Sequence, residues 1–235
     1  MKKALLVMAA SAGLAAGFVL GALQAAGPLL YWPVARLGAG AGDGPAVSPV
    51  SLPAAGDQVL GFRLATGDLI PGGGDEIAVG VTLAGGGVVA VFRRQGDVWV
   101  EAARMDGFAA IDGLEVRSAT GAGWELFIYD EHDELTGAFY LRRGLTILKW
   151  RAGAFVPVWA GTLYEEAYSL DPPMAERIVS AAEVNAGRGE LVVRGLHTRA
   201  RREADGAYRD VEEAPLSGRW RWDDGLFRFV AVPGG

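Results

Sequence analysis

The sequence predicts an all-β fold: three four-stranded antiparallel repeats, propeller-like or a partial propeller, after an N-terminal transmembrane helix. Two observations predict the repeats. Runs of β-branched and apolar residues alternate with glycine turns along most of the chain, which is typical of consecutive antiparallel strands. A shared pattern also occurs three times and begins each time with a glutamate, at Glu76, Glu125 and Glu190. The helix is predicted from an uncharged run between Ala4 and Val34.

Residues 1–34 are predicted to form a signal anchor. Lys2 and Lys3 precede the apolar run and mark its cytoplasmic side. The run exceeds the roughly 20 apolar residues that a helix needs to cross a bilayer, so we expect residues 4–32 to lie in the cytoplasmic membrane of a bacterium. The chain would then be a single-pass membrane protein with its C-terminal domain outside the cytoplasm. The alternative is a cleaved signal peptide and a secreted domain.

Two features of the N-terminal part bear on assembly. Gly13, Gly17 and Gly21 recur every four residues and would share one face of a helix. Small residues at this spacing let two transmembrane helices approach closely, which is compatible with a homo-oligomer. The general richness of signal sequences in Ala and Gly is the preferred explanation of the spacing. Residues 35–57 are rich in Gly, Ala and Pro and have almost no charge, which predicts a flexible linker before a β-repeat domain at residues 58–235.

Composition and motifs exclude several classes of function. The chain has a formal net charge of −6, which argues against nucleic acid as a partner. It has no cysteine, which excludes disulfides and thiol chemistry. None of the Gly-x-Ser-x-Gly, His-Glu-x-x-His or phosphate-loop motifs occurs. We therefore predict a protein that is not an enzyme and has no cofactor.

The three repeats share four predicted strands each, about twelve in all. Each contains Glu-[Ile/Leu]-x-[Val/Ile], a strand ending in an aromatic residue, a glycine turn and a second aromatic residue; the repeats cover about 58–106, 107–161 and 177–235. The glutamate-to-glycine distance grows from 20 to 28 to 35 residues (76 to 96, 125 to 153, 190 to 225), in the connection between the second and third strands. A lone four-stranded unit cannot bury both faces, so we expect neighbouring repeats to stack. The aromatic residues expected in these contacts are Phe92, Trp99, Trp150, Phe155, Trp222 and Phe227.

Gly67–Val79 reads GDLIPGGGDEIAV and resembles the FG-GAP/VCBS type of β-propeller repeat, in which an Asp-rich loop leads into a strand. The resemblance implies a propeller whose family mostly serves as extracellular adhesive or scaffolding modules. It also implies a Ca²⁺-binding loop, in which Asp68 and Asp75 match the ligands. Ile70 and Gly72 stand where further oxygen donors are expected, and Ca²⁺ needs six to eight oxygens, so an ordinary turn is the expectation. Three repeats are fewer than the four to eight blades of a closed propeller, so a second chain completes the ring or the stack is open.

Histidines and arginines are the candidates for binding a ligand or partner. His132 lies in the acidic segment 130–134, which is either a cation site or a solvated turn whose side chains diverge. His197, Arg199, Arg201 and Arg202 form a positive patch, in which Arg199 and Arg201 share one face of a strand. Such a patch fits phospholipid headgroups or an envelope polymer. The alternative is an edge hairpin that its charges keep soluble.

The predicted function is a membrane-tethered, extracytoplasmic binding or scaffolding module without catalytic activity. Its partner would be an unknown protein or an envelope polymer. The long second-to-third-strand connections of the second and third repeats would form the binding face, because insertions in repeat proteins collect on one side. One alternative is an enzyme or enzyme accessory that acts on cell-wall glycan, which requires carboxylates and exposed tryptophans in one cleft. The other is a structural oligomerisation module.

Overall fold

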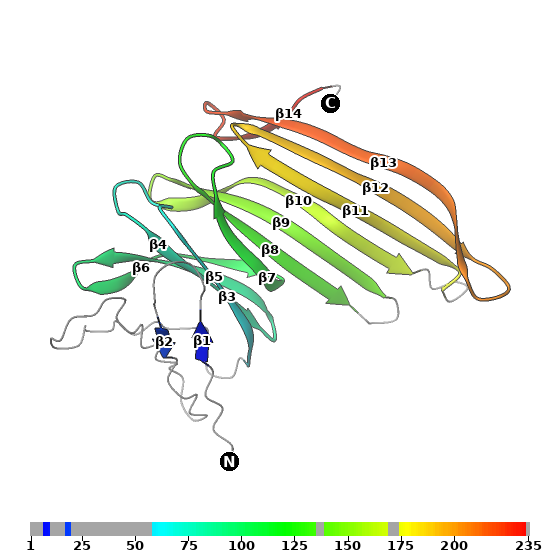
Figure 1. Cartoon of the computed structure of the whole chain (residues 1–235), viewed down its shortest axis with the longest axis horizontal. Coiled ribbons are helices and arrows are strands. Elements are labelled where there is room, and N and C mark those ends of the chain that lie inside the picture. The colour runs from blue at the N-terminus through cyan, green and yellow to red at the C-terminus, as the bar shows by residue number, and fades with distance from the viewer. Residues whose placement is uncertain (1–6, 10–16, 20–57, 135–138, 169–173, 234–235) are drawn as a thin grey trace, which may run out of the picture.

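The computed structural model describes residues 7–9, 17–19, 58–134, 139–168 and 174–233. All regular secondary structure in these residues is β-strand (Figure 1). The strands are β1 (Val7–Ala9), β2 (Gly17–Val19), β3 (Val59–Gly67), β4 (Glu76–Leu83), β5 (Gly86–Gln95), β6 (Val98–Phe108), β7 (Ala110–Arg117), β8 (Glu125–Glu134), β9 (Tyr140–Arg151), β10 (Ala154–Tyr168), β11 (Glu176–Gly187), β12 (Glu190–Arg202), β13 (Tyr208–Asp223) and β14 (Arg228–Ala231).

The described strands of the domain form two antiparallel sheets. One contains β3 to β6 and the other β7 to β14, and in both sheets each strand pairs with the next strand in the chain. The prediction of an all-β, antiparallel fold is therefore confirmed. Alternating apolar residues and glycine turns produce this meander because short turns join strands that are adjacent in the sequence.

The predicted transmembrane helix lies largely outside the described residues. Within residues 1–34 the structure describes β1 and β2, which pair with each other and are strands where the sequence predicts helix. No helix among the described residues is long and apolar enough to cross a membrane. Gly13, Gly21 and the linker at 35–57 lie outside the described residues, and Gly17 begins β2. The anchor, the linker and the helix–helix contact stay predictions.

The twelve strands from β3 to β14 divide into three successive units of four: the first unit (β3–β6), the second unit (β7–β10) and the third unit (β11–β14). Glu76, Glu125 and Glu190 begin the second strand of their units, as expected. One hydrophobic cluster joins the first and second units, and another joins the second and third. The buried members of these clusters include Val89, Val91, Leu114, Leu126 and Ile128 in the first, and Phe127, Leu145, Ile147, Leu191 and Phe229 in the second.

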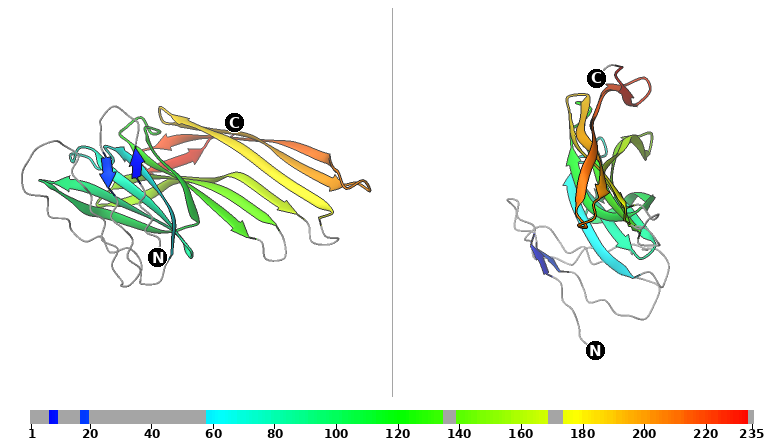
Figure 2. Two further views of the ribbon diagram at one scale, coloured as in Figure 1. Left: turned by 60° about the horizontal axis from the view of Figure 1, so that its bottom comes forward. Right: turned by 90° about the vertical axis from the view of Figure 1, so that its right-hand side faces the viewer.

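The expectation of three separate sheets is wrong for the second and third units. Strand β10 is hydrogen-bonded to β11 from the Tyr164–Ala181 pair to the Tyr168–Arg177 pair, which makes their eight strands one sheet. The sequence predicts longer connections between the second and third strands of the second and third units. In the structure the extra residues lengthen the strands themselves, so the hairpins β8–β9 and β12–β13 extend beyond the hydrophobic clusters. These extensions, together with the ends of β10 and β11, form a single layer that projects away from the first unit (Figures 1 and 2).

We call this single layer the wing; it comprises residues 130–134, 139–143, 164–168, 176–182, 195–202 and 208–216. No wing residue belongs to a hydrophobic cluster of the described residues. Its polar contacts include a buried carboxylate, that of Glu166, which accepts hydrogen bonds from Tyr164 (2.6 Å), Tyr168 (3.0 Å) and Arg177 (2.8 Å). Burial raises the pKa of Glu166, but these hydrogen bonds outweigh it and lower the pKa below its ordinary value. The ionised carboxylate therefore ties β10 to β11.

A buried glutamate fastens the first loop of the first unit. Glu76 is inaccessible to solvent, and its Oε2 accepts the N–H groups of Leu69 (2.7 Å) and Ile70 (2.9 Å). Its Oε1 is buried without a hydrogen-bond partner. Burial raises the pKa of Glu76, and the two N–H groups only partly offset this.

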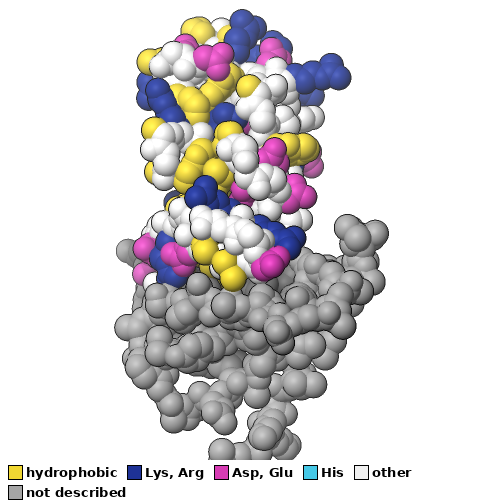
Figure 3. Space-filling view, turned by 90° about the vertical axis from the view of Figure 1, so that its left-hand side faces the viewer, with side chains coloured by type: hydrophobic (Ala, Val, Ile, Leu, Met, Phe, Trp, Pro, Cys, Tyr) yellow, Lys and Arg dark blue, Asp and Glu magenta, His cyan; other side chains and the backbone are white. Residues whose placement is uncertain are grey.

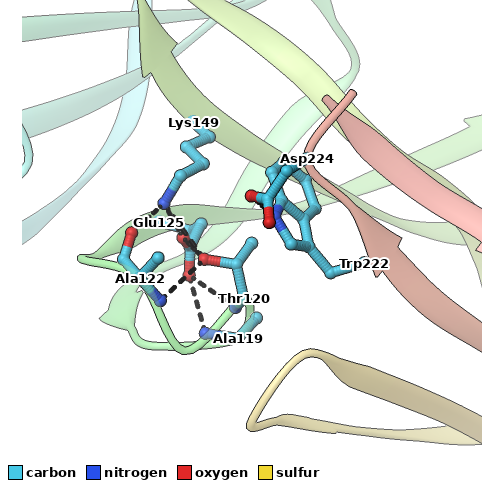
Figure 4. A network of polar contacts seen from close by, with 7 residues as sticks. All are labelled: Ala119, Thr120, Ala122, Glu125, Lys149, Trp222 and Asp224. Carbon is cyan, nitrogen blue, oxygen red and sulfur yellow. Dashed lines mark hydrogen bonds and ion pairs between the residues drawn. The ribbon is translucent and has the colours of Figure 1, made fainter. Parts of the chain in front are cut away.

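The second unit repeats this anchor and adds a cation to it. Glu125 is also inaccessible to solvent, and it accepts the N–H groups of Ala119 (2.6 Å) and Thr120 (3.3 Å) (Figure 4). Its Oε1 accepts hydrogen bonds from the Thr120 hydroxyl (2.7 Å) and the Lys149 ammonium group. Lys149 also donates to the carbonyl of Ala122 at 2.6 Å. The segment 119–122 is thereby held at both ends.

Replacing Lys149 with methionine should destabilise the domain. Methionine keeps much of the apolar volume but leaves the carboxylate of Glu125 buried without its cation, which costs about 3–5 kcal/mol. Urea unfolding of the full chain measures this cost. The double variant K149M/E125Q is the control and should recover part of the loss, because it removes the uncompensated charge. A loss below about 1 kcal/mol in K149M would show that the ion pair is dispensable.

Replacing Glu76 with glutamine should change how stability depends on pH. Because the folded-state pKa is raised, protonated Glu76 contributes stability that is present below its ordinary value of 4.5 and lost as the pH rises through the folded-state pKa. The variant E76Q lacks this loss, so its stability relative to the parent should rise across that interval by up to ~1.4 kcal/mol per pH unit. Unfolding free energies at several pH values test this; a difference that does not vary with pH contradicts it.

Candidate functional site

The hairpin between β11 and β12 is anchored to the second unit. Its two-residue turn, Arg188–Gly189, has φ values of 53° and 79°, which are typical of a type I′ turn. The N–H group of Gly189 donates to the carbonyl of Ala119 (2.8 Å), and the carbonyl of Gly189 accepts from Trp222 (2.8 Å). Ala119 belongs to the loop that Glu125 holds, beside the gold hairpin in Figure 4. The buried glutamate therefore sets the position of the turn.

The edge of β11 near this turn is free of a neighbouring strand. Strand β10 pairs with β11 only up to Ala181, and the rest of β10 pairs with β9 alone. From residue 182 to 187, β11 is paired with β12 on one side and with no strand of the described chain on the other. The two units separate at this point because each turns a face toward the cluster that contains Leu145 and Leu191.

A groove of about 750 Å³ lies beside this free edge. Its lining comes from the end of β7 and from both strands of the β11–β12 hairpin, and we call it the arginine groove. The lining residues are Arg117, Glu183, Val184, Asn185, Gly187, Arg188, Glu190, Val192 and Arg194. Three guanidinium groups and two carboxylates therefore meet there.

Among the described residues, two of the three arginines of the arginine groove have no ion pair, and the same is true of one of its two carboxylates, Glu183. Arg188 and Arg194 are exposed and have no ion pair with any described residue. Arg117 lies 3.4 Å from Glu115 and over the ring of Phe127, whose centroid is 4.9 Å away. Glu190, in contrast, is paired: Arg219 at 3.0 Å donates a hydrogen bond that lowers its pKa.

The outward face of the third unit carries two further arginines, Arg219 and Arg221, which both pair with Glu190, at 3.0 Å and 3.7 Å. The register of β12 and β13 places Arg194, Arg219 and Arg221 on the same face, which carries the exposed side chains of these strands. Seen from the left-hand side of Figure 1, Lys and Arg side chains are interspersed with Asp, Glu and hydrophobic side chains over the described part of the surface (Figure 3).

The structure does not bring the two histidines together. His132 lies on β8 and His197 on β12, and three strands of the sheet, β9, β10 and β11, lie between them. His132 is 3.6 Å from Glu134, and His197 Nδ1 is 2.9 Å from the hydroxyl oxygen of Ser180. Each histidine therefore has a local partner on the wing.

The predicted positive patch on β12 is largely neutralised. Arg199 and Arg201 share a face, as expected, and both contact Glu176, at 2.8 Å and 3.6 Å. The hydrogen bond from Arg199 lowers the pKa of Glu176, so the carboxylate is ionised at neutral pH. Arg202 lies one position beyond Arg201, on the opposite face. The alternative of a charged, soluble hairpin describes this part of the wing better than a binding patch.

The predicted metal candidates lie on either side of a buried anchor. Asp68 and Asp75 are exposed at the two ends of the loop that Glu76 fastens. Both charges raise the pKa of Glu76 further, after the larger effect of burial. No group of three or more metal-ligating side chains occurs in the part of the chain that the structure describes.

Four tryptophans pack in the hydrophobic clusters between units: Trp150, Trp159, Trp220 and Trp222. Trp159 and Trp220 face each other edge-on, with ring centroids 5.8 Å apart, in the cluster between the second and third units. Where β10 leaves β11, a cavity of about 320 Å³ contains Trp220 and one carboxylate, Glu165. Trp124 is 47% exposed but does not line this cavity. Among the described residues, this cavity contains one carboxylate and one tryptophan, whereas a glycan-cleaving site requires several carboxylates and exposed tryptophans.

Sequence reasoning missed that Arg188 and Arg194 are the exposed arginines of a groove. Both precede the predicted patch by a few residues, and nothing in the sequence shows that Glu176 neutralises the later arginines. The sequence feature that indicates the position of Arg188 is the segment Gly187-Arg188-Gly189. It is typical of a tight hairpin turn, which places Arg188 at the end of a sheet.

Comparisons with known proteins assign no family. No family model and no curated protein matches the chain. A crystal structure of a protein from Lactobacillus plantarum is 8% identical and has a TM-score of 0.20, over 72% of this chain and 83% of that one. So low a TM-score supports no statement about fold or function. The resemblance to FG-GAP/VCBS repeats and the closure of a propeller therefore stay predictions.

Proposed function

We propose that the protein is a membrane-tethered, extracytoplasmic binding module without catalytic activity, and that it binds an anionic partner through the arginine groove. The observation that carries this proposal is the convergence of Arg117, Arg188 and Arg194 on one groove of about 750 Å³. Guanidinium groups bind carboxylates and phosphates through paired hydrogen bonds. The tether and the location rest on the charged start and apolar run of residues 1–34.

Two features support binding as the role of this surface. The groove contains cations from two different units, so its shape depends on their stacking and not on one flexible hairpin. Arg188 also occupies a left-handed conformation that asparagine or glycine adopts more easily. An anion in the groove gives a reason for an arginine at this position.

Reversing the charge of Arg188 and Arg194 should weaken anion binding. The probe is fluorescein-labelled polyphosphate, and its affinity for the full chain in nonionic detergent is measured by fluorescence anisotropy. We expect a loss of about tenfold per arginine in R188E/R194E and a falling affinity of the parent as salt rises, because exposed charge pairs are screened.

The matched control reverses two exposed arginines of the wing, in R202E/R209E. This variant has the same net charge as R188E/R194E, so an effect of overall charge would appear equally in both. Equal losses in the two variants would show that binding is not located in the groove. Absence of polyphosphate binding by the parent protein would contradict the proposed anionic partner.

Replacing Arg188 with asparagine should raise stability and lower affinity together. Asparagine tolerates the left-handed conformation and is favoured in type I′ turns, so the unfolding free energy should increase by roughly 1 kcal/mol. Loss of the guanidinium group should weaken polyphosphate binding about tenfold. The variant R188A separates the two effects, because it removes the charge but keeps the strained backbone. If R188N is more stable and binds like the parent, Arg188 does not contact the ligand.

A further inference from the structure

We infer that the partner of the arginine groove is an extended acidic peptide segment, which adds as a strand to the free edge of β11 at residues 182–187. This inference rests on the proposed function and specifies the ligand of the same site. The groove and the free edge are adjacent, because Glu183, Val184 and Asn185 belong to both. Peptides commonly bind exposed sheet edges in this way, with backbone hydrogen bonds for affinity and side chains for specificity.

The hairpin turn fixes which backbone groups are available. A two-residue turn makes Gly187 and Glu190 a hydrogen-bonded pair, and such pairs alternate along an antiparallel ladder. Ala182, Val184 and Ala186 therefore direct their N–H and C=O groups away from β12. An added strand of about six residues, ~20 Å long, would satisfy these groups.

Another free edge of this sheet, that of β13, is protected, whereas the β11 edge is not. Strand β14 pairs with β13 only from Trp220 to Asp223, so the remainder of β13 is also an edge. That edge carries acidic residues, a proline and a bulge, which are devices that prevent strand addition. The protecting residues are Asp210, Glu212, Glu213 and Pro215, with the register shift opposite Arg199 and Ala200. The β11 edge has no proline, and the residues whose N–H and C=O groups point away from β12 are Ala182, Val184 and Ala186.

Charge specifies the side chains of the added strand. Alternate side chains of a strand point to opposite faces, so every second residue of the peptide would lie on the outward face with Arg194. On that face Arg194 lies opposite Glu183 of β11, Arg188 stands at the end of the edge, and Arg117 lines the same groove. These three guanidinium groups outnumber Glu183, the carboxylate of the groove that has no ion pair in the described chain, so acidic residues on the outward face of the peptide complement the groove. The residues between them would lie on the side of Ala182, Val184 and Ala186, where small apolar side chains fit.

The test uses a labelled, end-blocked peptide of alternating glutamate and valine, with polyphosphate as the second probe. Replacing Ala186 with proline removes an N–H group that points away from β12, toward the free edge. The substitution therefore breaks no hydrogen bond between β11 and β12. We expect A186P to bind the peptide at least tenfold more weakly and polyphosphate nearly as well as the parent. Urea unfolding of A186P checks that the hairpin is intact.

Two N-methylated peptides decide the question with the parent protein if A186P does not fold. Methyl groups on one alternate set of amide nitrogens face β11 and should abolish binding, whereas methyl groups on the other set should leave it unchanged. Equal binding of both methylated peptides, or equal peptide affinity of A186P and parent, would overturn the strand addition while leaving the anion site intact. Failure of polyphosphate to bind the parent would reject the proposed function itself. Dimers that form without peptide would assign the edge to a second copy of the chain.

Discussion

The structure depends on carboxylates buried where the second strand of a unit begins. Glu76 and Glu125 each accept two backbone N–H groups from the loop before that strand, so each loop is closed onto its own sheet. In the second unit the cation of Lys149 completes the arrangement. The carbonyl of Ala119 then points to Gly189, and through that bond the second unit holds the turn of the third. The glutamate that fastens a loop within the second unit thus also positions the contact between the second and third units.

The joining of the second and third units follows from competition between two kinds of contact. Near the turns, the two four-stranded units pack face to face, because this buries the apolar side chains around Phe127 and Leu191. In this region β10 and β11 are therefore not paired as neighbours in one sheet. Beyond the clusters there is little apolar surface to bury, and backbone pairing between β10 and β11 dominates. The sheet therefore divides where the cluster begins. One side of that division is the unpaired edge of β11, so the free edge is a consequence of how the core is distributed.

Much of this architecture could be predicted from residues that act locally. Glycine turns and β-branched runs identify the strands, and the repeated glutamates identify the second strand of each unit. The joining of β10 to β11 could not be predicted, because it depends on whether two strands continue past the core. The site was missed for a similar reason: Arg199 and Arg188 have the same chemistry in the sequence, and only the pairing of Glu176 with Arg199 distinguishes them.

The third unit shows how one position can change its role between repeats. Its glutamate, Glu190, is half-buried and no longer fastens a loop, because a two-residue turn has replaced that loop. The carboxylate instead pairs with Arg219 on the outward face, which orders the side chains beside the groove. Shortening the loop also brings Arg188 to the tip of the hairpin, in a conformation unfavourable to arginine. The turn that lacks the structural anchor therefore carries the arginine that we propose for anion binding, and the anchor in the second unit keeps that turn in place.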